Sequence, residues 1–231
     1  RWDDAGAYIL RGCGDVDPRD PPPGCRYINA GEKPYDDVDL IRSLTVSSDV
    51  YYYRIGESIY VNPNHRDTAI QEAAGAYGLG LETGITLPFE QGGYMPTPAN
   101  RRQRNELNPM AFPEWGWSTG DNVITAIGQG EVLVTPLQLA NAFATFANGG
   151  TLRSPNVVSS VRTRDGDEVR DFGPRQMATV DIDPKFRDIA LAELSCETSD
   201  EHGTAYWAFN SEATGCAYFP VDRVPIAGKT G

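Results

Sequence analysis

The sequence predicts an α+β fold, in which helices dominate the middle of the chain and strands lie late. Apolar residues recur at helical spacing in the middle, strand-like alternation comes only after it, and no regular βαβ plan links them. The 231 residues suffice for one good core, with room for two subdomains. We expect residues 1–35 to be an irregular loop region, residues 36–150 a mainly helical subdomain, and residues 151–231 a hairpin, a helix and a final strand.

Turn chemistry makes the first segment irregular, because "DPRDPPPGC" is rich in Pro, Gly and Asp. Two short helices should follow it, the first capped by Asp37 or Asp39 and the second by Ser48. A third helix is predicted within "DTAIQEAAGAYGLG", from Asp67 as its cap to the Gly-Leu-Gly stop. The sequence over residues 85–122 contains many Pro, Gly and Trp and is expected to be mostly irregular.

The clearest element is the helix in "TPLQLANAFATFANGG". Thr135 is its N-cap, Pro136 occupies the first helical position, and Gln138 completes a capping box. A hairpin should follow, formed by "NVVSSVRT", the turn "RDGD" and "EVRDF". A further helix begins at Asp183 and Pro184, and "DRVPIAGKTG" ends the chain as a predicted strand.

The charge of the chain argues against nucleic acid as a partner. Its formal net charge is −12, and the densest basic segment, "RRQR" over residues 101–104, is interpreted as a solvated loop. No apolar run of about 18 residues is present, so no membrane span is expected. The N-terminus lacks a start Met and the layout of a signal peptide, and we expect the chain to be a piece of a longer protein.

Metal and cofactor sites have little support. There is no C-x-x-C, and His65 and His202 lie far in sequence from any Cys, so no zinc site is expected. A Gly-rich phosphate-binding pattern after a strand is also missing. We therefore expect neither a metal nor a cofactor.

Three stretches could carry chemistry: Ser47-Ser48-Asp49 at a helix junction, Lys229-Thr230-Gly231 at the end of a strand, and "GDNVITAIGQGEVLVTPLQLANAFATFANGG" between them. Each alone has an ordinary explanation as a helix cap, a strand end or a loop entering a helix. Their order and spacing along one chain make a joint function the better interpretation.

Together these stretches resemble the transpeptidase domain of penicillin-binding proteins, which uses S-x-x-K, then S-x-N or S-x-D, then K-[TS]-G. "LTVSSDVYYYRIG" is similar to the second motif, and "HGTAYWAF" before "VPIAGKTG" is similar to the approach to the third. The resemblance covers residues from about 36 to 231 and is closest to class B proteins of the cell-elongation type, penicillin-binding protein 2. It implies the penicillin-binding protein/serine β-lactamase-like fold, an antiparallel sheet flanked by helices plus an all-helical subdomain, truncated here at both ends.

The first motif is missing from these residues. The chain has three lysines, and the positions three residues before them hold Ala30, Ile182 and Ile226 instead of Ser. The resemblance therefore implies that the nucleophilic Ser and its Lys lie upstream of Arg1, and that this chain is inactive alone.

The resemblance implies acyl transfer through a serine acyl-enzyme. Ser47, Asp49 and Lys229 are the expected catalytic residues: Ser47 relays a proton, Asp49 orients the catalytic Lys, and Lys229 supplies positive charge. Ser48, Thr230 and Gly231 are expected to bind substrate, with Thr230 on its terminal carboxylate. Asp49 stands where many relatives have Asn.

The implied partners are the D-Ala-D-Ala stem peptide of peptidoglycan, β-lactam antibiotics and a membrane glycosyltransferase of the SEDS type, with no nucleic acid. The implied location is the extracytoplasmic face of the bacterial membrane, with an anchoring N-terminal helix that this chain lacks. Two alternatives stay open: a β-lactam sensor or non-catalytic scaffold, and a serine β-lactamase.

An extracytoplasmic location would allow disulfides to persist. Cys13 and Cys25 bracket one Pro-rich loop, and Cys196 and Cys216 bracket a helix end and the segment after it. We predict the pairs Cys13–Cys25 and Cys196–Cys216 over the two long-range connectivities, with four unpaired thiols as the open alternative.

Overall fold

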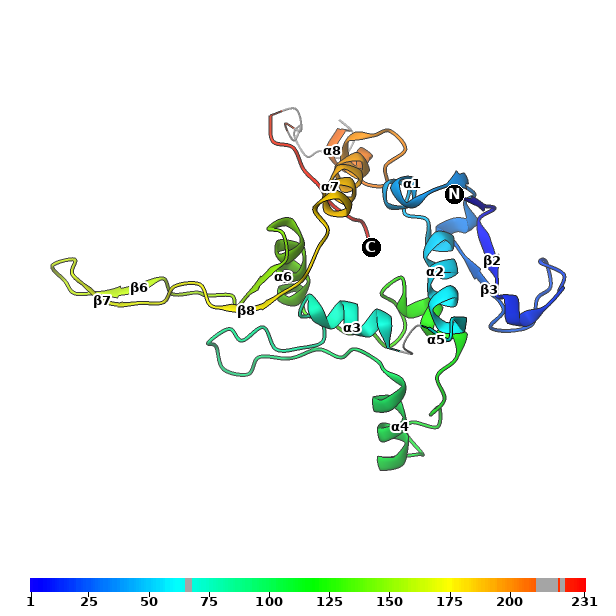
Figure 1. The fold of residues 1–231 in the computed structure, drawn as a ribbon, viewed down its shortest axis with the longest axis horizontal. Helices are drawn as coiled ribbons and strands as arrows, with labels where there is room; N and C mark the ends of the chain where they lie inside the picture. The colour runs from blue at the N-terminus through cyan, green and yellow to red at the C-terminus, as the bar shows by residue number, and fades with distance from the viewer. Residues whose placement is uncertain (65–67, 211–219, 221–222) are drawn as a thin grey trace. The chain divides into compact units, whose positions relative to one another are not determined.

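The computed structural model describes residues 1–64, 68–210, 220 and 223–231, and its elements confirm the α+β class (Figure 1). The chain divides into two compact units, each assembled from distant segments. These differ from the contiguous segments expected from the sequence. Unit 1 comprises Arg1–Arg66, Ser118–Gln129 and Lys185–Gly231, and unit 2 comprises Asp67–Trp117 and Gly130–Pro184.

Unit 1 combines two short antiparallel strand pairs with helices. Strand β1 pairs with β4, and β2 pairs with β3. The elements are β1 (Trp2–Asp4), β2 (Ala7–Ile9), 3-10 helix η1 (Arg11–Cys13), β3 (Arg26–Ile28), η2 (Ala30–Glu32), β4 (Asp36–Val38), α1 (Leu40–Thr45), α2 (Asp49–Val61), α5 (Thr119–Thr125), α7 (Pro184–Ser199) and α8 (Tyr206–Asn210). Residues 1–35 thus hold three strands, which Pro and Gly content alone did not indicate.

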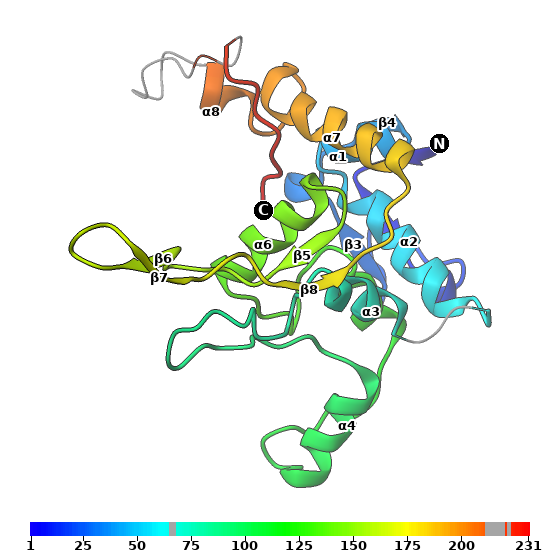
Figure 2. The same ribbon diagram turned by 60° about the vertical axis from the view of Figure 1, so that its left-hand side comes forward.

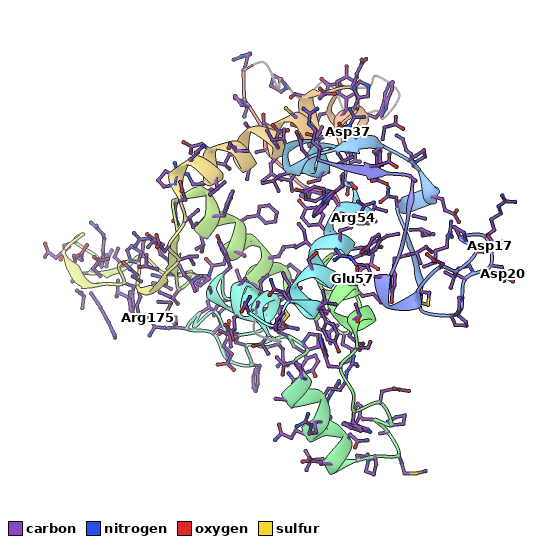
Figure 3. All side chains as sticks on the ribbon, turned by 45° about the vertical axis from the view of Figure 1, so that its right-hand side comes forward. Asp17, Asp20, Asp37, Arg54, Glu57 and Arg175 are labelled. Carbon is purple, nitrogen blue, oxygen red and sulfur yellow. A yellow bond between two sulfur atoms is a disulfide. The ribbon has the colours of Figure 1, made fainter. Side chains whose placement is uncertain are left out.

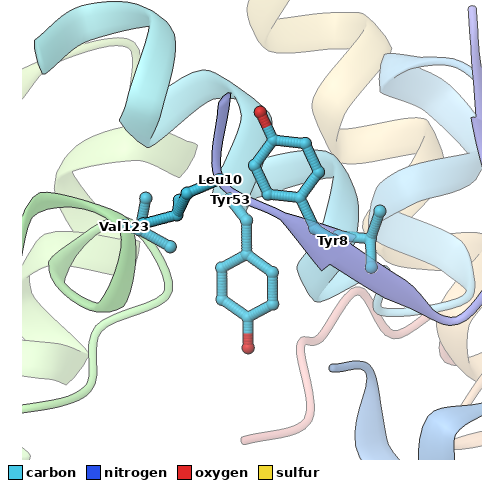
Figure 4. Close-up of a cluster of buried hydrophobic side chains, with 5 residues drawn as sticks. Tyr8, Leu10, Tyr53 and Val123 are labelled. Atoms are coloured by element: carbon cyan, nitrogen blue, oxygen red, sulfur yellow. The ribbon is translucent and has the colours of Figure 1, made fainter. Parts of the chain in front are cut away.

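The core of unit 1 forms where α2 packs on α5 and on β2. Tyr8, Leu10, Val50, Tyr53 and Val123 make one buried hydrophobic cluster (Figure 4). Helix α2 presents two of these residues at a three-residue spacing, which places them on one helical face. This packing fixes the helix that begins at the Asp of the Ser-Ser-Asp motif.

A buried carboxylate ties the N-terminal segment to the same helix. Glu57, labelled on α2 in Figure 3, is only 1% exposed. It accepts hydrogen bonds from the Tyr8 hydroxyl and from the Arg11 backbone N–H (2.8 Å), and it pairs with Arg11 Nε at 3.2 Å. The charge of Glu57 is thereby compensated, as a buried carboxylate requires. Burial raises the pKa of Tyr8, and so does the neighbouring Glu57 carboxylate.

The predicted helix caps of unit 1 are confirmed. Asp39 accepts a hydrogen bond from Arg42 N at the start of α1, and Ser48 accepts one from Tyr51 N (3.2 Å) at the start of α2. The two helices are separated by only three residues, and Ser47 between them adopts a left-handed φ of 57°.

Unit 2 contains α3 (Ala69–Ala76), α4 (Pro98–Leu107), α6 (Pro136–Ala147), β5 (Thr151–Arg153), β6 (Ser160–Arg162), β7 (Glu168–Asp171) and β8 (Gln176–Thr179). Helix α6 lies along β5, which pairs with β8, and β6 and β7 form the predicted hairpin (Figure 2). The capping box of Thr135 and Gln138 is confirmed. Helix α3 has Thr68 at its cap position, and the expected cap, Asp67, lies outside the described residues.

Residues 85–122 are mostly irregular, as expected, but α4 and the first residues of α5 also lie there. Helix α4 begins with a second Thr-Pro capping box, in which Thr97 and Asn100 bond reciprocally. The basic segment belongs to this helix and is no solvated loop: Arg101 is 8% exposed and stacks on the Trp117 ring at 4.9 Å. The Arg101 guanidinium therefore packs against an aromatic ring inside the protein.

The final strand is also absent from the described residues. The stretch from Val224 to Gly231 has no assigned secondary structure, and its backbone bonds to a helix: Gly228 N donates to Leu194 O (2.9 Å). Thr198 Oγ1 donates to Ile226 O (2.8 Å). A strand requires a neighbouring strand, and in the described residues α7 occupies that side of the segment.

Cys13 and Cys25 form the first predicted disulfide, with 5.9 Å between their Cα atoms. Cys196 on α7 has no disulfide partner among the described residues, and Cys216 lies outside them, so the second pairing stays a prediction. Among the described residues, none of the helices is both long and apolar enough to cross a bilayer.

Candidate functional site

A cavity of about 580 Å³ in unit 1 is lined by all six site residues that the sequence predicted: Ser47, Ser48, Asp49, Lys229, Thr230 and Gly231. The first three come from the α1–α2 junction and the last three from the final residues of the chain. Leu44, Tyr52 and Ile127 add an apolar wall. Two motifs far apart in the sequence thus share one cavity within a single unit.

Ser47 and Lys229 are in direct contact. Lys229 Nζ donates a hydrogen bond to Ser47 Oγ at 2.7 Å. The left-handed φ of Ser47 is uncommon for a residue with a Cβ, and such backbone strain is concentrated at functional sites. The tight turn between two helices imposes this conformation and aims the hydroxyl at the cavity.

Ser48 points the other way. Its hydroxyl is fully buried, donates to the Asp4 carboxylate and accepts from Tyr51 N. Asn29 Nδ2 also donates to Asp4 (2.9 Å), while Asn29 Oδ1 accepts from Val50 N (2.9 Å). This buried network anchors the start of α2 to β1. The geometry favours a positioning role for Ser48 over the substrate contact expected from the sequence.

Asp49 opens α2 and borders the cavity. Partial burial raises the pKa of its carboxyl, the Lys229 ammonium lowers it, and the nearby Asp4 carboxylate raises it; the net direction is upward. The environment thus brings the protonated form of Asp49 closer to neutral pH than for an exposed aspartate.

Sequence reasoning missed Glu197, the residue on which the Lys-Thr-Gly segment converges. This side chain on α7 is fully buried, and its Oε1 accepts from Lys229 Nζ (3.3 Å) and from Thr230 N (2.7 Å). The hydroxyls of Thr230 (2.6 Å) and Thr204 (2.5 Å) donate to the same oxygen. The only sequence signal was its spacing from the buried Leu194, three residues earlier and so on the same helical face.

The cavity combines one cation, several hydroxyls and a half-buried carboxyl. Lys229 and Thr230 can bind an anionic group, and Ser47 bonded to Lys229 can accept or pass on a proton. Gly231 lines the same cavity and adds no side chain to it. Among the described residues, no group of three or more His, Cys, Asp and Glu side chains could hold a metal ion. This set of groups suits acyl transfer to or from a substrate with a carboxylate.

The family model of the penicillin-binding protein transpeptidase domain matches residues 20–231. A curated relative, peptidoglycan D,D-transpeptidase MrdA of Escherichia coli (strain K12), is 27% identical over 217 residues, which is 90% of this chain and 30% of the relative. The chain therefore spans less than a third of the length of this protein.

Solved structures share the fold. Pseudomonas aeruginosa PBP2 in complex with WCK 5153 superposes with a TM-score of 0.67 at 24% identity, over 88% of this chain and 40% of that one. A structure described as "Structural coordination of polymerization and crosslinking by a peptidoglycan synthase complex" gives a TM-score of 0.67 at 26% identity, over 90% of this chain and 30% of that one.

Proposed function

The chain belongs to the penicillin-binding protein transpeptidase family, and from this premise we propose that it is part of a peptidoglycan D,D-transpeptidase of the cell-elongation type. The protein cross-links stem peptides ending in D-Ala-D-Ala and binds β-lactams. Its nucleophilic serine belongs to an S-x-x-K motif outside these 231 residues. The matched relative carries the corresponding name, which supports the assignment.

The observation that carries the proposal is the hydrogen bond from Lys229 Nζ to Ser47 Oγ. In the first step the serine oxygen bonds to the carbonyl carbon of the penultimate D-Ala, and the C–N bond to the last D-Ala breaks. The attacking serine gives its proton to the lysine of the S-x-x-K motif. That lysine protonates Ser47 as Ser47 passes its own proton to the leaving nitrogen, and the charged Lys229 holds Ser47 in place through their hydrogen bond. In the second step an amine of a neighbouring stem displaces the serine oxygen, which regains its proton.

The remaining site residues bind and orient. Lys229 binds the terminal carboxylate of the stem peptide through its positive charge, and the Thr230 hydroxyl rotates from Glu197 to donate to that carboxylate when substrate is bound. Gly231 leaves room for the substrate backbone. Asp49 accepts hydrogen bonds from the lysine of the S-x-x-K motif when ionised and so orients it.

We place the domain on the extracytoplasmic face of the membrane, held by an anchor outside this chain. The disulfide between Cys13 and Cys25 supports this location, because disulfides persist in oxidising compartments. A SEDS-type glycosyltransferase is the proposed membrane partner, since the chain resembles a structure titled as a peptidoglycan synthase complex.

Labelling with a fluorescent penicillin tests the proposal. The full-length protein should form a stable covalent adduct at a serine outside these residues, and the isolated 231-residue chain should form none. Labelling of the isolated chain would overturn the motif assignment. A full-length protein that takes no label would be a non-catalytic scaffold, and one that hydrolyses the adduct rapidly would be a β-lactamase.

A further inference from the structure

A carboxylate lies where two effects disfavour it. Glu197 is 0% exposed, and it sits in the last turn of α7, which ends at Ser199. Burial penalises its charge, and the negative end of the helix dipole penalises it again. A residue retained under both penalties must be compensated by specific partners.

The hydrogen bonds that compensate the charge of Glu197 all reach one of its two carboxylate oxygens. Four donors share Glu197 Oε1, and they come from Lys229, Thr230 and Thr204. The other oxygen, Oε2, is buried without a hydrogen-bond partner. Thr204 itself lies 2.6 Å from the Thr230 hydroxyl. Every described partner of this carboxylate is therefore a residue of the Lys-Thr-Gly triplet or a contact of it.

Before the triplet, the backbone of the segment is anchored by groups other than Glu197. Leu194 O accepts from Gly228 N, and Thr198 Oγ1 donates to Ile226 O. Those two bonds fix the chain path before the triplet. Glu197 adds contacts at the triplet itself. It accepts from the Thr230 backbone N–H, and it holds two side-chain groups, the Lys229 ammonium, which also bonds Ser47, and the Thr230 hydroxyl.

We infer that Glu197 is a positioning residue for the Lys-Thr-Gly triplet, fixing the Lys229 ammonium against Ser47 and the Thr230 hydroxyl at the cavity. This inference rests on the proposed function, because it assigns Glu197 to the acylation step. Glu197 acts through Lys229 and Thr230 and does not itself line the cavity. Because an ammonium held by a carboxylate loses rotational freedom, Lys229 meets the substrate already oriented.

Glu197→Gln in the full-length protein tests this assignment. The amide keeps the size of the side chain but removes the charge, so the acylation rate constant with a fluorescent penicillin should fall about tenfold or more. The thermal unfolding temperature checks that the variant folds. Glu197→Asp keeps the charge and should restore part of the rate. Glu201→Gln is the matched control: it removes an exposed carboxylate four residues away and should acylate like the wild type.

A double-mutant cycle with Lys229→Ala separates positioning from a structural role. If Glu197 acts through Lys229, adding Glu197→Gln to Lys229→Ala should slow acylation much less than it does alone. Fully additive losses would overturn the inference. Should Glu197→Gln fail to fold, Thr204→Val removes one donor to Oε1 from an exposed site and should slow acylation about threefold; an unchanged rate would then refute it.

The outcomes distinguish the two proposals. If the wild-type protein takes no label, the proposed function fails and the role of Glu197 fails with it. If the wild type is labelled and Glu197→Gln is labelled at the same rate, only the inference about Glu197 fails.

Discussion

Lys229 Nζ and Ser47 Oγ are 2.7 Å apart although 182 positions separate the two residues along the chain. The contact joins the end of the sequence to the turn between α1 and α2. It is made inside one compact unit, whose α2–α5 packing and α7 hold the two motifs independently. A single hydrogen bond therefore reports whether the site is assembled.

Lys229→Ala and Ser47→Ala should each lower the acylation rate of the full-length protein about 100-fold or more. Each change removes one preorganised group from the proton path, and losses of this scale are typical of such groups. The measurement is time-resolved labelling with a fluorescent penicillin. Lys185→Ala, an exposed lysine that does not line the cavity, is the control. A Lys229→Ala protein that acylates at the wild-type rate would remove this residue from the mechanism.

Asp49→Asn should reduce acylation less than either of these changes, and it should alter the pH dependence of stability. The raised pKa of Asp49 means that the folded protein holds this proton more tightly than the unfolded chain does. The stabilisation is complete below the unfolded pKa of about 3.9 and is lost as the pH rises through the folded pKa. As the pH rises from about 3.9 through the folded pKa of Asp49, the free energy of unfolding of Asp49→Asn should therefore increase relative to that of the wild type. Above the folded pKa, the difference should stay level.

Urea unfolding at a series of pH values measures this difference. Asp20→Asn, on the exposed loop between the disulfide cysteines, is the control variant. A difference between Asp49→Asn and wild type that stays constant from acid to neutral pH would contradict the burial of this carboxyl.

Local signals in the sequence predicted local structure well. The caps at Asp39, Ser48 and Thr135 were found because a side chain and a backbone N–H two or three residues away suffice to form them. Helix α4 was missed although Thr97-Pro98 repeats the Thr135-Pro136 signal, since Asn100 stands where a capping box usually has Glu or Gln.

Non-local features could not be predicted in this way. The residues before Lys229 have the composition of a strand, but in the structure they bond to α7. The pattern of apolar residues in a segment does not indicate which element the segment will pair with. In the sequence, Glu197 looks the same as an exposed glutamate on a helix. What distinguishes it is its contact with Lys229, 32 positions later, which the sequence does not show. The six residues that the motifs singled out lie at one cavity, and they could be grouped from the sequence because a motif pattern carries long-range information that periodicity lacks.

The disulfide between Cys13 and Cys25 closes a short loop, and its loss should reduce stability by about 3 kcal/mol in the loop-entropy model. The double variant Cys13→Ser/Cys25→Ser tests this by urea unfolding. Peptide mapping without reductant should recover the linked pair. The same map tests the second predicted pair, Cys196–Cys216. Linkage of Cys13 or Cys25 to either of the late cysteines would contradict the observed connectivity.

Gly56→Ala should destabilise the protein although alanine is the better helix former. Helices α2 and α5 approach closely at this position: a Cβ on Gly56 would lie 3.0 Å from Val123 Cα and 3.1 Å from Asn122 O. Both are backbone atoms that cannot rotate away, and Asn122 Nδ2 already donates to Gly56 O at 2.8 Å. Overpacking of this kind costs about 1–3 kcal/mol.

Gly75→Ala on α3 is the matched control for Gly56→Ala, because a Cβ there meets no atom within 4 Å. Its expected effect is a stabilisation of up to about 1 kcal/mol from helix propensity and reduced chain entropy. Opposite signs for the two substitutions in urea unfolding would support the tight α2–α5 contact. Gly56→Ala should also slow penicillin acylation, since α5 leads directly into Ala126 and Ile127 on the cavity wall. Equal stabilisation by both substitutions would mean that the two helices do not pack as closely as the structure shows.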